Sequence, residues 1–195
     1  MCAACLRHCE GGTNEPVGMD EVAQCASCGR SVCTAHQAVC AVDEQIQCSR
    51  HLRRADGSGR LVCEQHRATC VSEPEAVFAA DEVSACPVCG KTACAAHLAA
   101  CGYCGRQVCT ADLVLQSGRC ATCAALETAE PPEDVVAAAL AGANGSKTLG
   151  PSGKRSWRMA RDRTHVVLEL NAGWRRRTVF TLPHGAAKPD RVVTH

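Results

Sequence analysis

The sequence predicts a small, metal-stabilised α+β protein, and three observations lead to this fold class. The chain has 195 residues and contains eighteen cysteines, all of them between positions 2 and 123. Most of these cysteines recur as Cys-x-x-Cys or Cys-x-x-His pairs. Aromatic residues make up only 3% of the chain, which leaves too little large apolar volume for an ordinary core. Bound metal must therefore supply much of the folding free energy.

The cysteine pairs form a repeat with a constant spacing. The clearest copy starts at Cys25 and reads Cys-x2-Cys-Gly-Arg-Ser-Val-Cys-x2-His-x3-Cys, ending at Cys40. A second copy with the same spacing runs from Cys86 to Cys101. A looser third copy and a fourth copy, which shares Cys101, complete the series: Cys48, His51, Cys63, His66, Cys70; Cys101, Cys104, Cys109, Asp112, Cys120, Cys123. A phased series of this kind predicts several structural zinc sites, each closed by four ligands.

The ligand count limits the number of ions. Eighteen cysteines, five histidines that lie among them and Asp112 give twenty-four positions, enough for at most six zinc ions at four ligands each. We expect five or six ions, because His8 and Cys9 are adjacent and compete for one place. Asp112 stands where the other repeats carry histidine, and its alternative roles are a helix N-cap or a surface charge. The predicted ligands are Cys2, Cys5, Cys9, Cys25, Cys28, Cys33, His36, Cys40, Cys48, His51, Cys63, His66, Cys70, Cys86, Cys89, Cys94, His97, Cys101, Cys104, Cys109, Asp112, Cys120 and Cys123.

Two other uses of the cysteines stay open, namely a disulfide framework and iron–sulfur clusters. A disulfide framework does not require histidines at fixed distances from the cysteines, and iron–sulfur clusters rarely use so many histidine ligands. The first residues lack the apolar stretch of a signal peptide, and no apolar run is long enough to span a membrane. We therefore expect a reducing, cytoplasmic location, in which thiols are kept free for metal.

Each repeat predicts a local fold. Gly29, Gly90 and Gly105 follow a cysteine pair, at the position where a tight turn needs a residue that tolerates positive φ. Short strands are expected next, over residues 30–32, 91–93 and 106–108. Ligands at i, i+3 and i+7 then predict helices over 33–40, 63–70 and 94–101, with all three ligands on one helix face. A turn, a hairpin and ligands on a helix together form a treble-clef-like zinc finger.

The same spacing resembles the centre of B-box zinc fingers, which are related to RING domains. The resemblance covers roughly residues 20–123. It implies a cross-brace, in which alternate ligand pairs bind the same ion, so that Cys25/Cys28 and Cys33/His36 serve different ions. It also implies that the ions link the repeats into a chain. The third repeat departs from the pattern because it runs directly into the fourth.

Composition divides the chain into three regions. Residues 1–124 are the tandem zinc-binding array, and residues 125–153 are a linker with a short helix that begins at Asp134. Residues 154–195 form a small basic β-hairpin module, with ten Lys/Arg against three acidic residues. Residues 1–153 have the opposite balance, with eleven Lys/Arg against seventeen Asp/Glu. The nearly neutral total therefore hides a strong asymmetry.

The basic module is expected to be rich in strands. Residues 165–170 alternate with Val166, Leu168 and Leu170 on one face. A second strand is expected over 174–182 and a third over 156–161. Both tryptophans of the chain lie in this module, and each is predicted to face inward with its strand.

A cluster of arginines near two tryptophans suits phosphate contacts and base stacking. The predicted nucleic-acid-binding residues are Arg155, Arg158, Arg161, Arg163, Arg175, Arg176, Arg177, Trp157 and Trp174. Two alternatives remain open, an acidic protein partner and a solvated face that keeps a small sheet soluble. The sequence contains no base-reading finger of the Cys2His2 spacing, so it predicts no sequence specificity.

Catalytic motifs are missing from the sequence. It contains no HExxH, no HxE with a later PCxxC, no GxxxxGK[ST] and no GxSxG. We therefore expect a protein that is not an enzyme. The first functional hypothesis is a zinc-finger accessory protein that binds DNA or RNA beside a larger protein partner. The alternative is a zinc-scaffolded protein–protein interaction adaptor, as B-box and RING-type modules are.

Overall fold

The computed structural model describes residues 6–10, 16–141, 156–172 and 177–195. Contacts divide the chain into two compact units. The first contains residues 1–84 and 92–95, and the second contains residues 85–91 and 96–195. The division falls at one hairpin, formed by β11 (Val83–Ala85) and β12 (Thr92–Cys94). The two units are described separately below.

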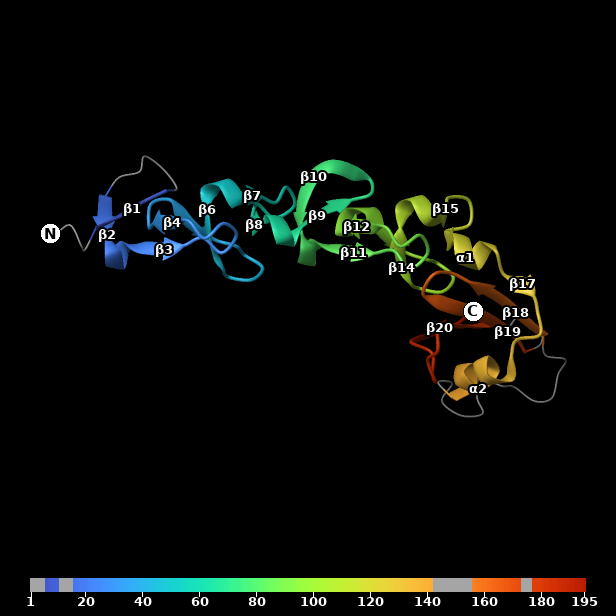
Figure 1. Ribbon diagram of the computed structural model, residues 1–195. Coiled ribbons are helices and arrows are strands. Elements are labelled where there is room, and N and C mark those ends of the chain that lie inside the picture. Colours follow the sequence, from blue (N-terminus) through green and yellow to red (C-terminus); the bar gives the residue numbers. More distant parts are fainter. Residues whose placement is uncertain (1–5, 11–15, 142–155, 173–176) are drawn as a thin grey trace. The chain divides into compact units, whose positions relative to one another are not determined.

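The first unit is a succession of short antiparallel hairpins joined by tight turns (Figure 1). Most strands are three residues long, because a ligand loop or a turn follows each of them. The hairpins are β1 (Leu6–His8) with β2 (Pro16–Gly18), β3 (Val22–Gln24) with β4 (Ser31–Cys33), β5 (Gln37–Val39) with β6 (Ile46–Cys48), β7 (Leu52–Arg54) with β8 (Leu61–Cys63), and β9 (Arg67–Cys70) with β10 (Glu73–Ala79). The 3-10 turns are η2 (Met19–Glu21), η3 (Ser49–His51), η4 (Glu64–His66) and η5 (Ala80–Glu82).

The second unit continues the hairpins and ends in a larger sheet. Its hairpins and turns are η6 (Ala95–His97), β13 (Leu98–Ala100) with β14 (Gln107–Cys109), η7 (Thr110–Asp112), and β15 (Leu113–Val114) with β16 (Arg119–Cys120). The helix α1 (Ala121–Ala124) follows. The sheet has five antiparallel strands in chain order: β17 (Glu127–Thr128), β18 (Ser156–Arg161), β19 (His165–Asn171), β20 (Arg177–Pro183) and β21 (Arg191–Thr194). The helix α2 (Glu133–Ala141) lies between β17 and β18 in the sequence.

An apolar core lies between α2 and one face of this sheet. Alternate residues of β19 and β20 supply it, as the period of a strand requires, and Ala138 and Ala139 of α2 cover it. Trp157 and Met159 of β18 pack against the same cluster. The fully buried members from the strands are Leu168, Leu170 and Phe180. Here the chain buries apolar side chains in the usual way and uses no metal ligand.

The helices predicted over 33–40, 63–70 and 94–101 are not present. In 63–70 the 3-10 turn η4 is followed at once by β9, in 94–101 η6 is followed by β13, and in 33–40 a turn over 34–36 is followed by β5. The strand is preferred because its backbone groups pair with the next strand, as Gln37 pairs with Cys48 in β5 and β6. An isolated helix of eight residues would have no such partner and would be marginal in water. The short strands predicted after each ligand loop are present one residue later, as β4, β12 and β14.

Candidate metal centres

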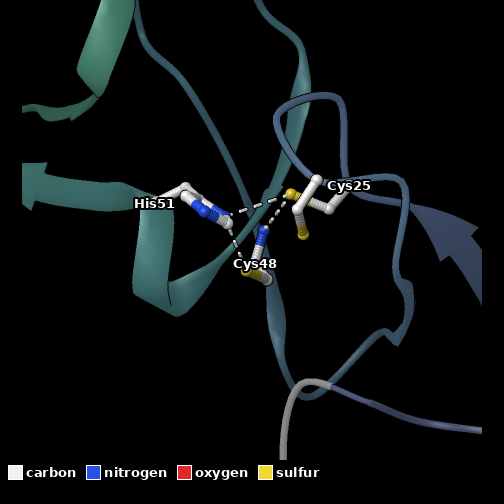
Figure 2. A group of neighbouring side chains, drawn as sticks. Cys25, Cys48 and His51 are labelled. Carbon is white, nitrogen blue, oxygen red and sulfur yellow. Dashed lines mark hydrogen bonds between the residues drawn. The ribbon is translucent and has the colours of Figure 1, made fainter.

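Each candidate metal centre combines two ligand pairs from neighbouring hairpins. Cys25 and Cys28 lie in the loop between β3 and β4, whereas Cys48 ends β6 and His51 ends η3. The four ligand atoms lie within 4.8 Å of one another. Figure 2 shows Cys25, Cys48 and His51 directed toward one another from separate parts of the backbone. The structure thus groups Cys25/Cys28 with a pair from the next hairpin, in the interleaved order that the resemblance implied.

The same construction recurs along the chain. The described residues contain six such groups. Three further groups of four are Cys40, Asp43, Cys63 and His66; Cys86, Cys89, Cys109 and Asp112; and Cys101, Cys104, Cys120 and Cys123. Cys70, Glu73 and Cys94 also belong together, and His97 follows at the end of η6.

Near the N-terminus, Sγ of Cys9 and Sγ of Cys33 lie 3.4 Å and 3.3 Å from Nδ1 of His36. This arrangement repeats the pairing of a loop cysteine with a Cys-x-x-His pair from the following hairpin. The predicted ligands Cys2 and Cys5 lie outside the described residues.

The ligand loops that begin at Cys25, Cys40, Cys86 and Cys101 share one backbone conformation. At the first loop the Cys25 N–H donates to the Arg30 carbonyl at 2.9 Å, and the Gly29 N–H donates to the Cys25 carbonyl at 2.8 Å. This turn needs a left-handed residue at its fifth position, where Gly29 has φ 69°. Glu44 takes this position in the loop that starts at Cys40, with φ 58°. The turn directs the side chains of its first and fourth residues to the same ion.

A backbone hydrogen bond joins the two halves of each group. The Cys48 N–H donates to Sγ of Cys25 at 3.3 Å, and the Cys63 N–H donates to Sγ of Cys40 at 3.4 Å. The same contact recurs in both units, from Cys109 to Cys86 at 3.3 Å and from Cys120 to Cys101 at 3.1 Å. A hydrogen bond to a charged acceptor stabilises that charge. At Cys25, whose pKa is lowered, the Cys48 N–H therefore favours the thiolate form, which is the form that binds metal.

The distances within the groups fit a tetrahedral ion. Zn–S bonds of about 2.3 Å and Zn–N bonds of about 2.0 Å place neighbouring sulfur atoms about 3.8 Å apart and sulfur and nitrogen about 3.5 Å apart. Sγ of Cys89 and Sγ of Cys109 are 3.7 Å apart, and Sγ of Cys104 and Sγ of Cys120 are 4.0 Å apart. Sγ of Cys48 lies 3.1 Å from Nδ1 of His51. All described cysteines are free thiols, so the described residues contain no disulfide.

Within a group the pKa values of the thiols move in opposite directions. Burial would raise the pKa of Cys25, but backbone N–H donors, Cys48 first among them, outweigh it and lower that pKa to about 6. In the group of four cysteines, hydrogen bonds from Cys104, Cys120 and Cys123 lower the pKa of Cys101. The pKa of Cys123 is raised because its thiol donates to Cys101 first and to the other two sulfurs. In the group of four cysteines the thiolate is thus favoured at Cys101, and Cys123, whose thiol donates to it, keeps its proton more strongly.

Asp112 lies among thiols. Its Oδ2 is 3.0 Å from Sγ of Cys86 and 3.0 Å from Sγ of Cys109. Burial acts to raise the pKa of Asp112, but hydrogen bonds from Cys109, Cys89 and Cys86 lower it overall. The structure therefore places this carboxylate in the position that histidine occupies in other groups.

Two ligand candidates were missed at the level of sequence. Asp43 and Glu73 stand three residues after Cys40 and Cys70, which is the spacing between Cys25 and Cys28. The signal was available, because the repeat phase puts a ligand loop at each of these cysteines. The helices predicted over 33–40 and 63–70 end at Cys40 and Cys70, so the prediction places no ligand loop after these cysteines.

Cys101 has a different role from the one predicted. It was expected to end one zinc finger and begin the next, so that a single thiolate coupled two units. The structure places Cys101 in one group only, with Cys104, Cys120 and Cys123. The coupling comes from the hairpin, because β13 and β14 connect the Cys101 loop to Cys109, which belongs to the group before.

The predicted nucleic-acid-binding residues are spread over several environments. Trp157 packs against the apolar core, with its ring 6.4 Å from that of Phe180. Nη1 of Arg158 forms an ion pair at 3.2 Å with the buried Glu169. Arg161, Arg163 and Arg177 are exposed. Arg155, Trp174, Arg175 and Arg176 lie outside the described residues.

Loops of the last two metal groups contact the C-terminal sheet within the second unit. Arg106 and Asp162, both nearly inaccessible to solvent, form an ion pair at 2.7 Å. The Tyr103 hydroxyl donates to Glu169 at 2.7 Å. Nη1 of Arg191 donates to the Gly105 carbonyl at 2.7 Å. Arg191 of the sheet and the acidic side chains Asp162 and Glu169 thus hold the loop that begins at Cys101.

A cavity of about 560 Å³ lies between α2 and the sheet, where Val166 and Leu182 contribute to its lining. None of its lining residues belongs to a metal group. Among the described residues, no helix has the length and apolar character needed to cross a membrane.

Comparison of the chain with models of known protein families, with curated proteins and with solved structures found no match. The class of the protein therefore follows from its site: it is a metal-binding protein with serial Cys/His/carboxylate groups.

Proposed function

We propose that the protein is a non-catalytic, zinc-scaffolded interaction module, and that its metal is Zn²⁺, with five or six ions per chain. The observation that carries this proposal is the four-donor set of the groups, in which two to four ligands are cysteine thiols and imidazole or carboxylate supplies the rest. Structural zinc sites have four protein ligands, whereas catalytic sites keep one position for water or substrate.

Zinc fits these donors better than other common ions do. Thiolate and imidazole ligands select zinc over calcium, magnesium and manganese, which prefer oxygen. The carboxylates of Asp43 and Asp112 are acceptable zinc ligands when thiolates complete the set. Iron–sulfur clusters are usually held by cysteines alone.

A protein partner is the interaction that the side-chain environments support best. Trp157 packs against the core and Arg158 pairs with Glu169, so both side chains already have partners inside the protein. Large apolar side chains are instead exposed on the hairpins, with Leu115 at 95% and Met19 at 52% exposure. Exposed apolar side chains at loop tips provide anchors for a protein surface.

Nucleic-acid binding is the second candidate, and the exposed basic residues favour it. Arg161 and Arg177 are accessible on strands of the C-terminal sheet and Arg163 in the turn between β18 and β19, in a region with ten Lys/Arg against three acidic residues. Such a surface can contact phosphates without reading sequence.

Cobalt substitution tests the closed coordination. Tetrahedral Co²⁺ bound by thiolates gives intense visible absorption, and closed sites leave no position for an added ligand. We expect the spectrum of the Co²⁺-loaded protein to be unchanged by azide or free imidazole. Spectral shifts with these ligands would show an open position and would contradict the non-catalytic proposal.

A salt titration separates the two candidate partners. Binding of labelled duplex and single-stranded DNA is measured for the native chain, for the variant with Arg175, Arg176 and Arg177 changed to Ala, and for Leu115→Ser. If nucleic acid is the partner, the arginine variant flattens the slope of log K against log salt by about one to three units, and zinc content stays the same. No binding by any of the three proteins, together with loss of a captured protein partner in Leu115→Ser, supports the protein-interaction function.

A further inference from the structure

Ligand loops begin at regular intervals along the sequence, and one of the expected loops carries no metal ligand. Loops begin at Cys25 and Cys40, and the next place at the same interval is Ala55. Strands end in ligand pairs at Cys48 and Cys63, and the next strand end before a 3-10 turn is Ala79. The residues that occupy the four ligand places are Ala55, Ser58, Ala79 and Glu82.

The loop at Ala55 has the same backbone as the metal loops. The Ala55 N–H donates to the Arg60 carbonyl at 2.7 Å, and the Gly59 N–H donates to the Ala55 carbonyl at 2.7 Å. The equivalent bonds at Cys25 are 2.9 Å and 2.8 Å. Gly59 has φ 73°, as the fifth residue of a ligand loop requires. The turn is therefore fully formed, although no thiol is available to it.

The contact between neighbouring hairpins is also kept. The Asp56 N–H donates to the Val77 carbonyl at 2.7 Å. In the two preceding groups, Ala26 N–H donates to Ile46 at 2.9 Å and Ala41 N–H donates to Leu61 at 2.8 Å. The loop at Ala55 thus meets the following hairpin in the register that elsewhere brings two ligand pairs together.

Glu82 accepts the backbone hydrogen bond that a cysteine sulfur accepts in the metal groups. In the metal groups, the N–H of the strand-end cysteine donates to the sulfur of the loop cysteine. The Ala79 N–H has no sulfur to meet and donates to Oε2 of Glu82 at 3.0 Å. The other carboxylate oxygen, Oε1, is buried and lacks a hydrogen-bond partner. A polar side chain therefore still enters the space where a histidine ligand would stand.

Apolar packing and an ion pair stabilise this position in place of a metal. Ala55, Val62 and Ala79 form a buried cluster. Phe78, only 6% exposed, packs against Gly57 of the loop, where an added Cβ would lie 3.3 Å from the ring. Arg60 reaches both carboxylate oxygens of Asp81, at 2.9 Å and 3.0 Å. Phe78 is the one phenylalanine in the region of the metal groups, and it lies at the position that lacks a metal.

We infer that residues 55–58 and 79–82 form a seventh ligand frame of the array, that is, a loop and a strand end with the backbone conformation of a zinc site. An apolar cluster, and not a metal ion, stabilises this frame. The inference rests on the proposed function, because it requires the neighbouring groups to bind zinc. It also explains the looser third repeat, in which the expected cysteine pair between His51 and Cys63 is missing. The series of metal groups is interrupted here, with three groups before the frame and three after it.

Restoring the ligands tests the inference directly. The full-length variant with Ala55→Cys, Ser58→Cys, Ala79→Cys and Glu82→His receives the donor set of the Cys25 group. We expect its zinc content, measured by elemental analysis at equal protein concentration, to exceed that of the native chain by one ion. The thiolate-to-Co²⁺ absorption should rise in proportion. A control variant carries Ser84→Cys, Ala100→Cys, Ala124→Cys and Glu130→His at exposed positions. Its zinc content should not exceed that of the native chain.

A matched pair of glutamates tests the native protein without new ligands. Glu73→Ala removes a residue of a metal group and should weaken the binding of one zinc ion in a chelator competition by at least about tenfold. Glu82→Ala should leave the binding of every ion unchanged. If Glu82→Ala releases zinc, or if the restored variant folds without gaining an ion, the inference is wrong. If the native chain binds no zinc at all, the proposed function fails instead.

Discussion

Three carboxylates occupy ligand positions that cysteine or histidine fills elsewhere in the chain. Asp43 and Glu73 stand in the second place of a loop pair, and Asp112 stands in the place of a histidine. A carboxylate oxygen is a harder donor than a thiolate and suits zinc less well. We therefore expect the groups with carboxylates to release their ions before the group of Cys101, Cys104, Cys120 and Cys123.

Asp112 provides the sharpest test of this order. Asp112→Ala removes a donor that lies 3.0 Å from two cysteine sulfurs, and should lower the affinity of that group for zinc by at least about 100-fold. Asp112→His restores the donor set of the other repeats and should bind zinc at least as tightly as the native chain. The measurement is a competition with a coloured chelator, with Asp134→Ala in α2 as the control. Equal affinity in native protein and Asp112→Ala would show that Asp112 is not a ligand.

The buried ion pair of Arg106 and Asp162 should stabilise the fold although neither residue is a candidate metal ligand. Asp162→Asn leaves the Arg106 guanidinium buried without its partner, which should lower the free energy of unfolding by about 3–5 kcal/mol. Burial raises the pKa of Asp162, but the Thr164 N–H and Arg106 outweigh it and hold that pKa below its usual value. The stabilisation is therefore complete above the ordinary aspartate pKa and is lost as the pH falls through the lowered one.

Urea unfolding of the zinc-loaded proteins between pH 7 and pH 5 measures this cost. The difference between native protein and Asp162→Asn should stay constant over that range, because Asp162 stays ionised. The control is Asp190→Asn, whose exposed pair with His165 should contribute about 1 kcal/mol or less. A difference that already shrinks between pH 7 and pH 6 would contradict the assignment.

At the scale of elements, the repeating unit is a hairpin with a ligand loop at its tip and a ligand pair at its end. Its loop conformation is independent of the residues that bind metal, since the loop at Ala55 forms the same two hydrogen bonds as the loop at Cys25. In the five loops with this turn the fifth position adopts positive φ, and four of them have glycine there while one has Glu44; the loop at Cys70, with Pro74 at that place, does not form the turn. The backbone of the loop is therefore a property of the turn and not of the ion.

Two substitutions at this position should have opposite effects. Gly29→Ala meets no atom within 4 Å, so its only cost is the left-handed backbone, about 1 kcal/mol of unfolding free energy. Glu44→Gly removes the same strain and should stabilise the protein by a similar amount. Urea midpoints with saturating zinc report both changes. Destabilisation by Glu44→Gly would show that the Glu44 side chain makes a contribution larger than the strain.

At the scale of the whole molecule, two kinds of stabilisation coexist in one chain. The hairpins bury mostly cysteines and small residues, such as Val32 and Ala93, whereas the C-terminal sheet buries Phe180, Leu168 and Leu170. With the proposed zinc ions bound, metal would provide much of the folding free energy in the first case, whereas apolar surface provides it in the second.

Chelation should separate these two regions. We expect removal of zinc to abolish the hydrogen-exchange protection of β3 to β8, because their strands are too short to persist alone. Amides of β18, β19 and β20 should keep protection for longer, and Trp157 should keep its buried fluorescence. Simultaneous loss of protection in both regions would mean that the sheet also depends on metal.

The sequence by itself determined the nature of the site. The phased Cys-x-x-Cys and Cys-x-x-His pairs predicted metal groups without a structure, because tetrahedral coordination needs donors at these short intervals. The apolar alternation of Val166, Leu168 and Leu170 likewise indicated the inner face of a strand, and these residues lie in the core. Both signals are local, since each depends on residues that are close in sequence.

Only the tertiary structure decided which ligands share an ion. Cys25 has ligand candidates at similar sequence distances on both sides, and its pairing with Cys48 and His51 depends on how one hairpin packs on the next. The same packing placed Asp43 and Glu73 among cysteines, and it placed Ala55 and Ala79 in an apolar cluster where the four ligand places carry neither cysteine nor histidine. Coordination joins atoms that are distant in sequence, so the fold must bring the hairpins together before the donors can be assigned.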